Sequence, residues 1–223
     1  KSITFEADLK KKNWFNIVGK AKVFFRPNEL KELIEFLKIL NNKEKIHIIG
    51  AGSNTLITDE VYDGVIIKLG KNFNRLSVLN SNIIISGTAV LDKKLAEYAA
   101  ENSLSGFEFL ACIPGTIGGG LRMNAGCFGT EIKDILVSIQ AVDKKGNILT
   151  IPAKKINFDY RNNDLSDDLI FISASFKGEK QNTQKILETM SKLKAEKDYN
   201  QPTRIKTSGS TFKNPIKKTT KKA

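Results

Sequence analysis

Hydrophobic positions recur at helical spacing in three stretches of the chain. Over residues 28–40 they fall on one side of a helix, with Asn28 as the expected N-cap. A second helix is predicted over residues 90–102 and a third over 183–197. The apolar faces consist of Leu30, Leu33, Ile34, Leu37 and Leu40 in the first helix, Leu91, Leu95, Tyr98 and Ala99 in the second, and Ile186, Met190 and Leu193 in the third.

Short apolar runs bounded by turn residues predict strands in the rest of the chain. The predicted single strands are residues 22–27, 45–50 (a buried strand), 64–69 and 169–176, and the predicted hairpins are residues 75–89 and 136–151. The chain therefore begins with the order β-α-β-β, and we expect helix and sheet to share a core. A length of 223 residues fits one large domain or two modest ones.

Composition excludes several classes of protein. The sequence is 40% hydrophobic and 27% charged, as in ordinary globular proteins. No run approaches the roughly 18 apolar residues of a membrane span, and the first residues lack the apolar core of a secretion signal. Cys112 and Cys127 form neither a disulfide framework nor a metal-ligand pattern. The single histidine, His47, lies in an apolar run, so we expect a structural role for it.

The net charge of +12 raises the question of a nucleic-acid partner. The lysines are scattered, however, and four of them crowd the last seven residues, 217–223. Basic and aromatic residues do not alternate as they do in a base-stacking surface. The charge favours an anionic small ligand over nucleic acid.

The segment "IIGAGSNTLITD", residues 48–59, reads as a strand followed by a glycine turn. Its glycines suggest a dinucleotide fingerprint, but no amphipathic helix follows to receive a pyrophosphate, so we reject that interpretation. Successive backbone N–H groups over residues 50–54 can instead form an anion-binding nest, to which Ser53 and Asn54 add side-chain donors. The alternative is an ordinary connection between a strand and a turn.

A second segment, "CIPGTIGGGLRMNAGCFG", holds six glycines between residues 112 and 129. Pro114 and Gly115 predict a tight turn. The glycines at residues 118–120 would let the backbone lie close to a ligand or to another segment of the chain. Residues 121–126 are expected to form a short helix, and the N-terminal end of this helix would face the same ligand. Two such segments about sixty residues apart, in a basic chain, favour a large phosphate-bearing cofactor, although two independent turns remain an alternative.

Five motifs together resemble one known family. They are "NWFNIVGKAKVFFRP", "IIGAGSNTLITD", "FLACIPGTIGGGLRMNAGCFGTEIKD", "FDYRNN" and "QPTRIKTSGSTFKNP". Their order and spacing over residues 10–215 are similar to those of the UDP-N-acetylenolpyruvoylglucosamine reductase family. The resemblance implies an α+β FAD-binding fold of the PCMH (vanillyl-alcohol-oxidase-like) type. It implies FAD-binding subdomains at residues 1–75 and 76–178, and the start of an incomplete substrate-binding domain at 179–223.

The resemblance also implies the ligands. FAD is the expected cofactor and NADPH its reductant, and the substrate is a UDP-sugar of peptidoglycan synthesis. A cytoplasmic, monomeric enzyme of cell-wall synthesis, cell shape and cell division is expected, with no nucleic-acid or membrane partner. The implied FAD-binding residues are Gly50, Ala51, Gly52, Ser53, Asn54, Thr55, Pro114, Gly115, Thr116, Gly118, Gly119, Asn124, Ala125 and Gly126.

For the chemistry, the resemblance implies two catalytic residues. Arg161 would stabilise negative charge that develops toward a carboxylate, since a guanidinium is permanently charged and grips a carboxylate at two points. Ser210 would donate the proton, helped by Lys213. The resemblance makes Tyr160, Lys213 and Asn214 substrate contacts. Alternatively, Arg161 forms a surface ion pair and Ser210 lies in a Ser/Gly turn.

The sequence departs from the family at its end. Family members continue well past "FKNP", and no residue here matches their C-terminal catalytic glutamate. We therefore expect a fragment or a disrupted reading frame, in which FAD binding persists and catalysis is weakened. Three other functions stay open: another PCMH-type flavin oxidase, a non-catalytic FAD-binding remnant, and a nucleic-acid binder suggested by charge alone.

Overall fold

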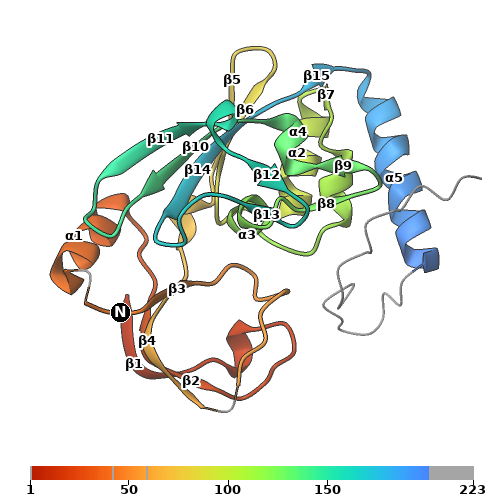
Figure 1. The fold of residues 1–223 in the computed structure, drawn as a ribbon. Coiled ribbons are helices and arrows are strands. Elements are labelled where there is room, and N and C mark those ends of the chain that lie inside the picture. The colour runs from red at the N-terminus through yellow and green to blue at the C-terminus, as the bar shows by residue number, and fades with distance from the viewer. Residues whose placement is uncertain (1, 42, 59, 201–223) are drawn as a thin grey trace, which may run out of the picture.

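The fold contains two main β-sheets, which lie in the lower and upper parts of Figure 1. A computed structural model describes residues 2–41, 43–58 and 60–200. The first sheet has the strand order β1-β2-β4-β3, formed by β1 (Ile3–Asp8), β2 (Lys20–Phe25), β4 (Val61–Ile67) and β3 (Ile46–Ile48). Strands β2 and β4 are parallel, as are β3 and β4, whereas β1 and β2 are antiparallel.

The second sheet is antiparallel throughout and has the order β11-β10-β14-β6-β5. Its strands are β5 (Leu76–Leu79), β6 (Ile83–Gly87), β10 (Leu136–Val142), β11 (Ile148–Pro152) and β14 (Ile170–Lys177). Three short pairs complete the β-structure: β7 (Leu104–Ser105) with β15 (Glu179–Lys180), β8 (Gly126–Cys127) with β9 (Thr130–Glu131), and β12 (Phe158–Asp159) with β13 (Asn162–Asn163). Both predicted hairpins are thus confirmed.

Five α-helices and four 3-10 helices accompany the sheets in the described residues. The α-helices are α1 (Leu30–Leu40), α2 (Asp92–Glu101), α3 (Ile117–Arg122), α4 (Ile132–Ile135) and α5 (Thr183–Asn200). The 3-10 helices are Lys10–Lys12, Lys71–Phe73, Glu108–Cys112 and Ala153–Lys155. The three long helices predicted from hydrophobic spacing are confirmed as α1, α2 and α5.

Helix α1 joins the two sheets. Its buried Leu33 and Leu37 pack in one cluster with Phe25 and Ile67 of the first sheet and with strand β14 of the second. The apolar face of α1 is therefore buried, because each of the two sheets covers part of it. The N-cap prediction was wrong, because the helix is capped one residue later. There Glu29 and Glu32 form a reciprocal capping box, and each carboxylate accepts a backbone N–H of the other residue.

Helix α2 packs its buried Leu95 and Ala99 into the large cluster beneath the second sheet, as predicted. The prediction that Leu91 lies on the apolar face of this helix was wrong. Leu91 is the N-cap residue, and 46% of it is exposed. Helix α5 keeps Ile186 buried, and Met190 packs at the edge of the same cluster. No helix in the described ranges is long and apolar enough to cross a membrane.

Two other predictions need correction. Residues 45–50 are not a buried strand: β3 is the edge strand of its sheet, and His47 on it is exposed. The helix expected at 121–126 begins earlier, at Ile117, and includes the three consecutive glycines. It ends at Arg122 because Asn124 has a left-handed φ of 41°.

Candidate cofactor site

The first glycine loop, residues 50–55, follows β3 and packs on the N-terminal segment. Gly52 has φ = 72°, and a Cβ there would lie 2.7 Å from the Lys12 carbonyl oxygen and 2.8 Å from Asn13 Cα. Only glycine fits both the conformation and the space. The Trp14 backbone N–H donates a 3.0 Å hydrogen bond to the Gly52 carbonyl. The carbonyl of Gly52 therefore fixes the loop against the N-terminal segment.

The N–H groups of residues 51–54 donate no hydrogen bond to any group that the structure describes. Gly52 is buried, Ala51 and Ser53 are half-buried and Asn54 is exposed, and buried backbone donors normally find partners. Successive donors of this kind form a concave anion-binding surface without a helix. These unpaired donors are what a phosphate cradle would offer, and the cradle stays a prediction beside the plain strand-to-turn connection.

The second glycine loop, residues 114–119, is anchored to the segment that links β6 to α2. The Asp92 N–H donates to the Gly115 carbonyl at 3.2 Å, and the Ile117 and Gly118 N–H groups donate to Val90 and Thr88 at 2.9 Å each. These bonds fix the turn before α3 begins. The loop is positioned by the second sheet, whereas the first loop is positioned by the first sheet.

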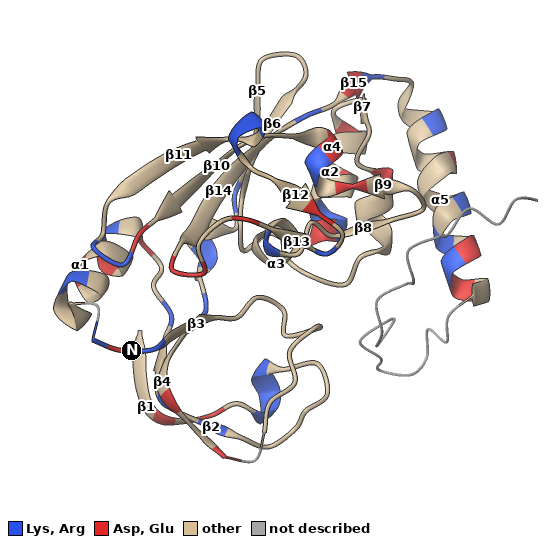
Figure 2. Ribbon diagram, viewed as in Figure 1, with Lys and Arg blue, Asp and Glu red and all other residues tan. Residues whose placement is uncertain are grey.

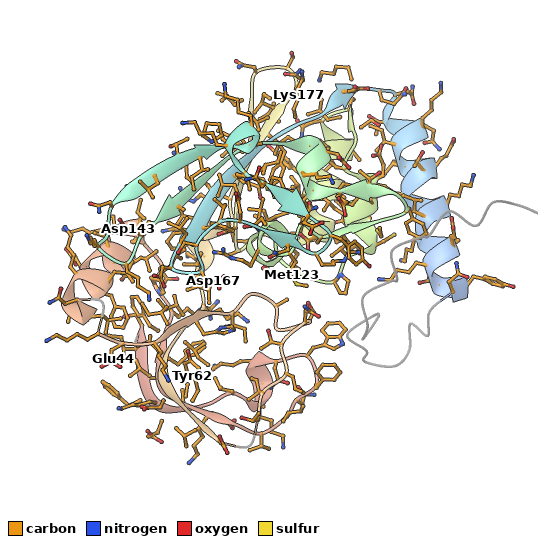
Figure 3. All side chains as sticks on the ribbon, in the orientation of Figure 1. Glu44, Tyr62, Met123, Asp143, Asp167 and Lys177 are labelled. Carbon is orange, nitrogen blue, oxygen red and sulfur yellow. The ribbon has the colours of Figure 1, made fainter. Side chains whose placement is uncertain are left out.

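The two loops meet although they lie about sixty residues apart. A Cβ on Gly50 would collide with the Thr116 hydroxyl, so the bare glycine backbone is what allows the contact. Further along, the Asn54 amide donates to the Met123 sulfur at 2.9 Å. Figure 3 places Met123 where the upper part of the molecule faces the lower part. The two segments singled out in the sequence thus contact each other between the sheets.

The buried polar atoms that lack a partner also gather at these loops. Across the described residues, buried side-chain nitrogen and oxygen atoms without a hydrogen bond occur only in Trp14 and Asp92. Trp14 binds the first loop through its backbone, and Asp92 binds the second. Unsatisfied buried polar atoms call for an explanation, and a bound ligand is one. The site residues therefore fit a phosphate-bearing cofactor such as FAD.

Burial raises the pKa of Asp92 from 3.8 to about 8, because the carboxylate would be desolvated. The carboxyl group is fully buried, at 0% exposure, and begins helix α2. Sequence reasoning missed this residue. An acid at the first position of an amphipathic helix looks like a favourable helix-dipole partner, and only the three-dimensional structure shows that the second glycine loop covers it.

Arg161 is brought to the end of the second glycine segment. It lies in the turn of the β12–β13 hairpin, with a left-handed φ of 58°. Its guanidinium donates to the Gly126 carbonyl at 2.8 Å, lies 3.9 Å from a Glu131 carboxylate oxygen and covers the Tyr160 ring at 4.9 Å. Its side chain remains 31% exposed. The group is held by the Gly126 carbonyl and still reaches solvent, so its role toward a substrate stays a prediction beside its ion pair with Glu131.

Asn124 holds this hairpin in place. Its buried side chain donates to the Asp159 carbonyl at 3.1 Å and to Glu131 at 3.0 Å, and accepts from the Lys133 N–H at 3.2 Å. Asn124 therefore has a structural reason to be present, beyond the cofactor contact predicted for it. Glu131, which contacts both Asn124 and Arg161, was not singled out from the sequence.

The remaining predicted site residues divide into two groups. Ala51, Thr55 and Ala125 lie in or beside the two loops, and their roles as cofactor contacts stay predictions. Ser210, Lys213 and Asn214 lie outside the described residues, so their predicted roles as proton donor and substrate contacts are not examined by the structure.

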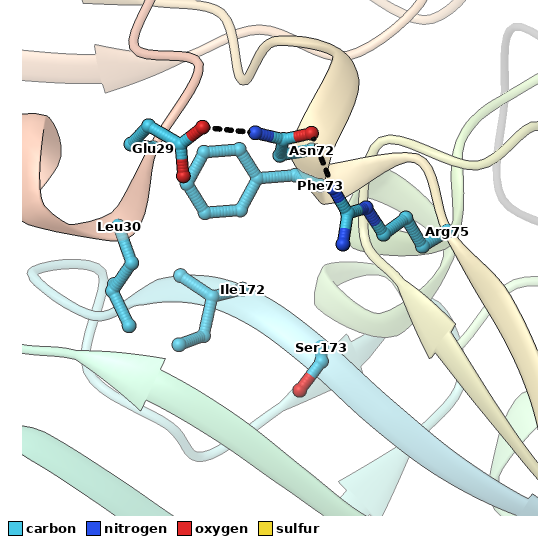
Figure 4. Close-up of a pocket in the computed structure, with 7 residues that line it drawn as sticks. All are labelled: Glu29, Leu30, Asn72, Phe73, Arg75, Ile172 and Ser173. Atoms are coloured by element: carbon cyan, nitrogen blue, oxygen red, sulfur yellow. Dashed lines mark hydrogen bonds between the residues drawn. The ribbon is translucent and has the colours of Figure 1, made fainter.

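A separate pocket lies between α1 and the second sheet (Figure 4). Leu30, Phe73 and Ile172 form its apolar wall. Its polar side chains bond one another: Asn72 donates to Glu29, and Arg75 donates to Asn72 at 2.8 Å. Because these groups satisfy themselves and no glycine-loop residue lines the pocket, it is not the phosphate site.

The fold and the loops define an FAD-binding protein of the α+β class. Residues 21–152 match the model of the "FAD binding domain" family. The protein resembles in structure the UDP-N-acetylenolpyruvylglucosamine reductase (MurB) of Thermus caldophilus, with a TM-score of 0.82, 26% identity, and coverage of 96% of this chain and 74% of that one. A weaker likeness to the glucose dehydrogenase Phl p 4.0202, at 8% identity and TM-score 0.59, reflects the fold alone.

Sequence relatives identify the family more closely. The chain is 64% identical over 220 residues to UDP-N-acetylenolpyruvoylglucosamine reductase of Pelagibacter ubique, covering 99% of this chain and 73% of the relative. The corresponding reductase of Rickettsia typhi is 46% identical, with coverage of 94% and 70%. The chain belongs to the UDP-N-acetylenolpyruvoylglucosamine reductase family, and both the predicted family and the predicted FAD-binding fold are confirmed. It spans about 70% of the length of these relatives.

Proposed function

We propose that the protein is an FAD-dependent reductase that converts UDP-N-acetylenolpyruvoylglucosamine to UDP-N-acetylmuramate, with NADPH as reductant, in peptidoglycan synthesis. The observation that carries the proposal is the junction of the two glycine loops, where free N–H donors and bare backbone meet. It occurs in a chain 64% identical to a reductase of that name. When bound, FAD supplies hydride-transfer chemistry that no amino-acid side chain offers.

The first loop would hold the pyrophosphate of FAD through its N–H groups, since successive backbone donors match phosphate oxygens. The second loop and residues 124–126 would lie along the flavin and its linker. Bare glycine backbone there lets a flat ring approach more closely than a side chain would allow. The net charge of +12 favours both this cofactor and a diphosphate substrate. Figure 2 shows basic positions spread over both parts of the molecule, which suits long-range attraction more than a single binding stripe.

Arg161 would bind the carboxylate of the enolpyruvyl group. As negative charge develops on that carboxylate during reduction, a fixed cation stabilises the transition state more than the ground state. The Gly126 carbonyl and Glu131 hold the guanidinium in place before the substrate arrives. Ser210 would then protonate the neighbouring carbon, with Lys213 and Asn214 beside the substrate.

We expect the protein to act in the cytoplasm and as a monomer. Two alternatives are another flavin oxidoreductase on the same fold and an FAD-binding protein with impaired catalysis. The described site offers no feature that favours either of them.

One experiment separates these functions. The purified chain is mixed with FAD, then NADPH, then the enolpyruvyl substrate, and the flavin absorbance is followed. The proposal predicts a bound yellow chromophore that NADPH bleaches and that the enolpyruvyl substrate restores without oxygen. Bleaching without substrate-dependent recovery would point to impaired catalysis or to another substrate, and a colourless protein would remove the proposal altogether.

A further inference from the structure

The β12–β13 hairpin that carries Arg161 is too short to hold its own shape. Each of its strands has two residues, and the turn between them places Arg161 at a left-handed φ of 58°. An isolated two-stranded hairpin is marginally stable in water, and a left-handed conformation is unfavourable for a residue with a long side chain. Contacts from outside the hairpin must therefore keep this turn in place.

Asn163, the last residue of β13, makes such contacts from a buried position. Its side-chain amide donates to the backbone carbonyls of Leu121 and Arg122, at 3.0 and 2.8 Å, and its side-chain oxygen accepts the Leu165 N–H at 3.0 Å. Only 8% of the residue is exposed. Leu121 and Arg122 end α3, and a helix leaves its last carbonyls without partners of its own. Asn163 therefore joins the end of α3 to the strand that follows Arg161 (Figure 1).

The surroundings of Asn163 make this connection stronger than the other bonds of the hairpin. The Arg122 guanidinium holds the chain that follows, because it donates at 2.8–3.1 Å to three backbone carbonyls, those of Leu165, Ser166 and Leu169. At the base of the hairpin, Asn157 and Asp164 also bond each other, but in an exposed position where water competes. Loss of the Asn163 amide would instead leave two carbonyls short of a donor at a mostly buried position, which is the more costly change.

We propose that Asn163 is a positioning residue for Arg161, which fixes the guanidinium relative to the second glycine loop by locking the hairpin to the end of α3. The inference rests on the reductase function proposed above. Helix α3 begins inside that loop and contains its three consecutive glycines, so the hairpin and the loop are held as one unit. Because Asn163 is buried, it acts on a substrate only through Arg161. A cation that is already in place stabilises developing charge without being ordered during the reaction.

The first test is a double-mutant cycle on the FAD-loaded full chain, with oxidation of NADPH by the enolpyruvyl substrate as the measurement. Asn163→Ala is expected to lower kcat/KM for that substrate by about tenfold or more, and to change the affinity for FAD by less than about threefold. In the Arg161→Lys background the same substitution should cost less than about twofold, because the positioned guanidinium is already absent. An equal loss in both backgrounds would overturn the proposal.

Asn162→Ala is the matched control, because Asn162 is the exposed neighbour of Asn163 on the same strand. It is expected to keep kcat/KM within about twofold of the wild type. A loss as large as that of Asn163→Ala would show that the connection to α3 is not what matters, and would overturn the proposal. Asn163→Ser keeps one donor on a shorter side chain, and it takes the place of Asn163→Ala in the cycle if the alanine variant does not fold.

NMR relaxation of the arginine Nε groups supplies a readout that does not depend on turnover. On the full chain, with and without FAD, the Arg161 Nε–H is expected to have an order parameter of about 0.8 or more in the wild type and below about 0.6 in the Asn163 variant, with no change in Asn162→Ala. A mobile Arg161 in the wild type, or an unchanged one in the Asn163 variant, would overturn the proposal. A wild type that does not oxidise NADPH with the enolpyruvyl substrate would instead count against the reductase function, and the NMR result would still decide the role of Asn163.

Discussion

The guanidinium of Arg161 donates a 2.8 Å hydrogen bond to the backbone carbonyl of Gly126, the last residue of the "NAG" run in the second glycine segment. Two segments separated by 34 residues are thereby joined at one edge of the proposed flavin site. The contact fixes the cation relative to the loop that is expected to hold the cofactor. The position of the Arg161 guanidinium relative to the proposed substrate carboxylate would then be set by the fold and would not depend on a freely rotating side chain.

Replacing Arg161 with lysine is expected to lower kcat by about 100-fold or more, since one ammonium cannot keep the carbonyl contact and grip a carboxylate at two points. FAD affinity should change by less than about threefold, because the substitution leaves both loops intact. Steady-state oxidation of NADPH with the enolpyruvyl substrate measures the effect. The matched control is Arg75→Lys, at the separate pocket, which should retain wild-type turnover. Full turnover in Arg161→Lys would show that the guanidinium does not act on substrate.

Gly52 and Gly129 allow a test of the close packing under the first loop. Both have positive φ, 72° and 82°, but a Cβ at Gly52 meets backbone atoms, whereas at Gly129 it meets nothing within 4 Å. Gly129→Ala is expected to cost about 1 kcal/mol of unfolding free energy from the backbone strain alone. Gly52→Ala should cost about 3 kcal/mol and weaken FAD binding as well. Urea unfolding and FAD titration check both values, and equal costs for the two variants would contradict the packing described here.

Leu33 tests whether α1 holds the two sheets together. Its side chain is fully buried, at 0% exposure, between residues of both sheets. Leu33→Ala should lower the unfolding free energy by about 3 kcal/mol, through lost burial and the cavity left behind. On the same helix Ile39 is 80% exposed, and Ile39→Ala should change the stability by less than about 0.5 kcal/mol. If urea unfolding gave similar losses of unfolding free energy for Leu33→Ala and Ile39→Ala, Leu33 would not be packed between the two sheets.

The Asp92 carboxyl makes the stability of the cofactor-free protein depend on pH. Its pKa is raised from 3.8 to about 8 by burial, so the unfolded chain releases the proton near pH 4 while the folded chain keeps it. The stability that this group provides is complete below pH 4 and is lost as the pH rises to 8. Asp92→Asn has no such loss and should be more stable than the wild type at pH 7, by about 4 kcal/mol. Urea unfolding at pH 4 and pH 7 measures the gain, which should shrink toward zero at pH 4. A constant difference at both values would show that Asp92 does not titrate in this range.

Much of the fold follows from local patterns. The faces of α1, α2 and α5 and the two hairpins are visible in the sequence because the side chains that form them lie within a few residues of each other. The boundaries were harder to predict. Glu29 replaces Asn28 as the N-cap because its reciprocal bonds with Glu32 satisfy two backbone donors, where a single amide would satisfy one.

What the sequence concealed depends on contacts between distant segments. The apolar neighbours of His47 suggested a buried strand, but pairing places β3 at the edge of its sheet, where one side of the strand is open. Asp92 was not singled out from the sequence, because only the fold shows that the second glycine loop covers it. Both glycine segments were recognisable, whereas their direct contact through Gly50 and Thr116 required the arrangement of the two sheets.

The central claim is that the two glycine loops together form one FAD site. Titration of the cofactor-free protein with FAD at pH 7, followed by flavin fluorescence and absorbance, tests it most directly. One FAD is expected to bind per chain with saturation, and Gly52→Ala should weaken the binding at least about tenfold while Gly129→Ala does not. A chain that stays colourless in excess FAD, or one that binds FAD equally well with both substitutions, would contradict the account.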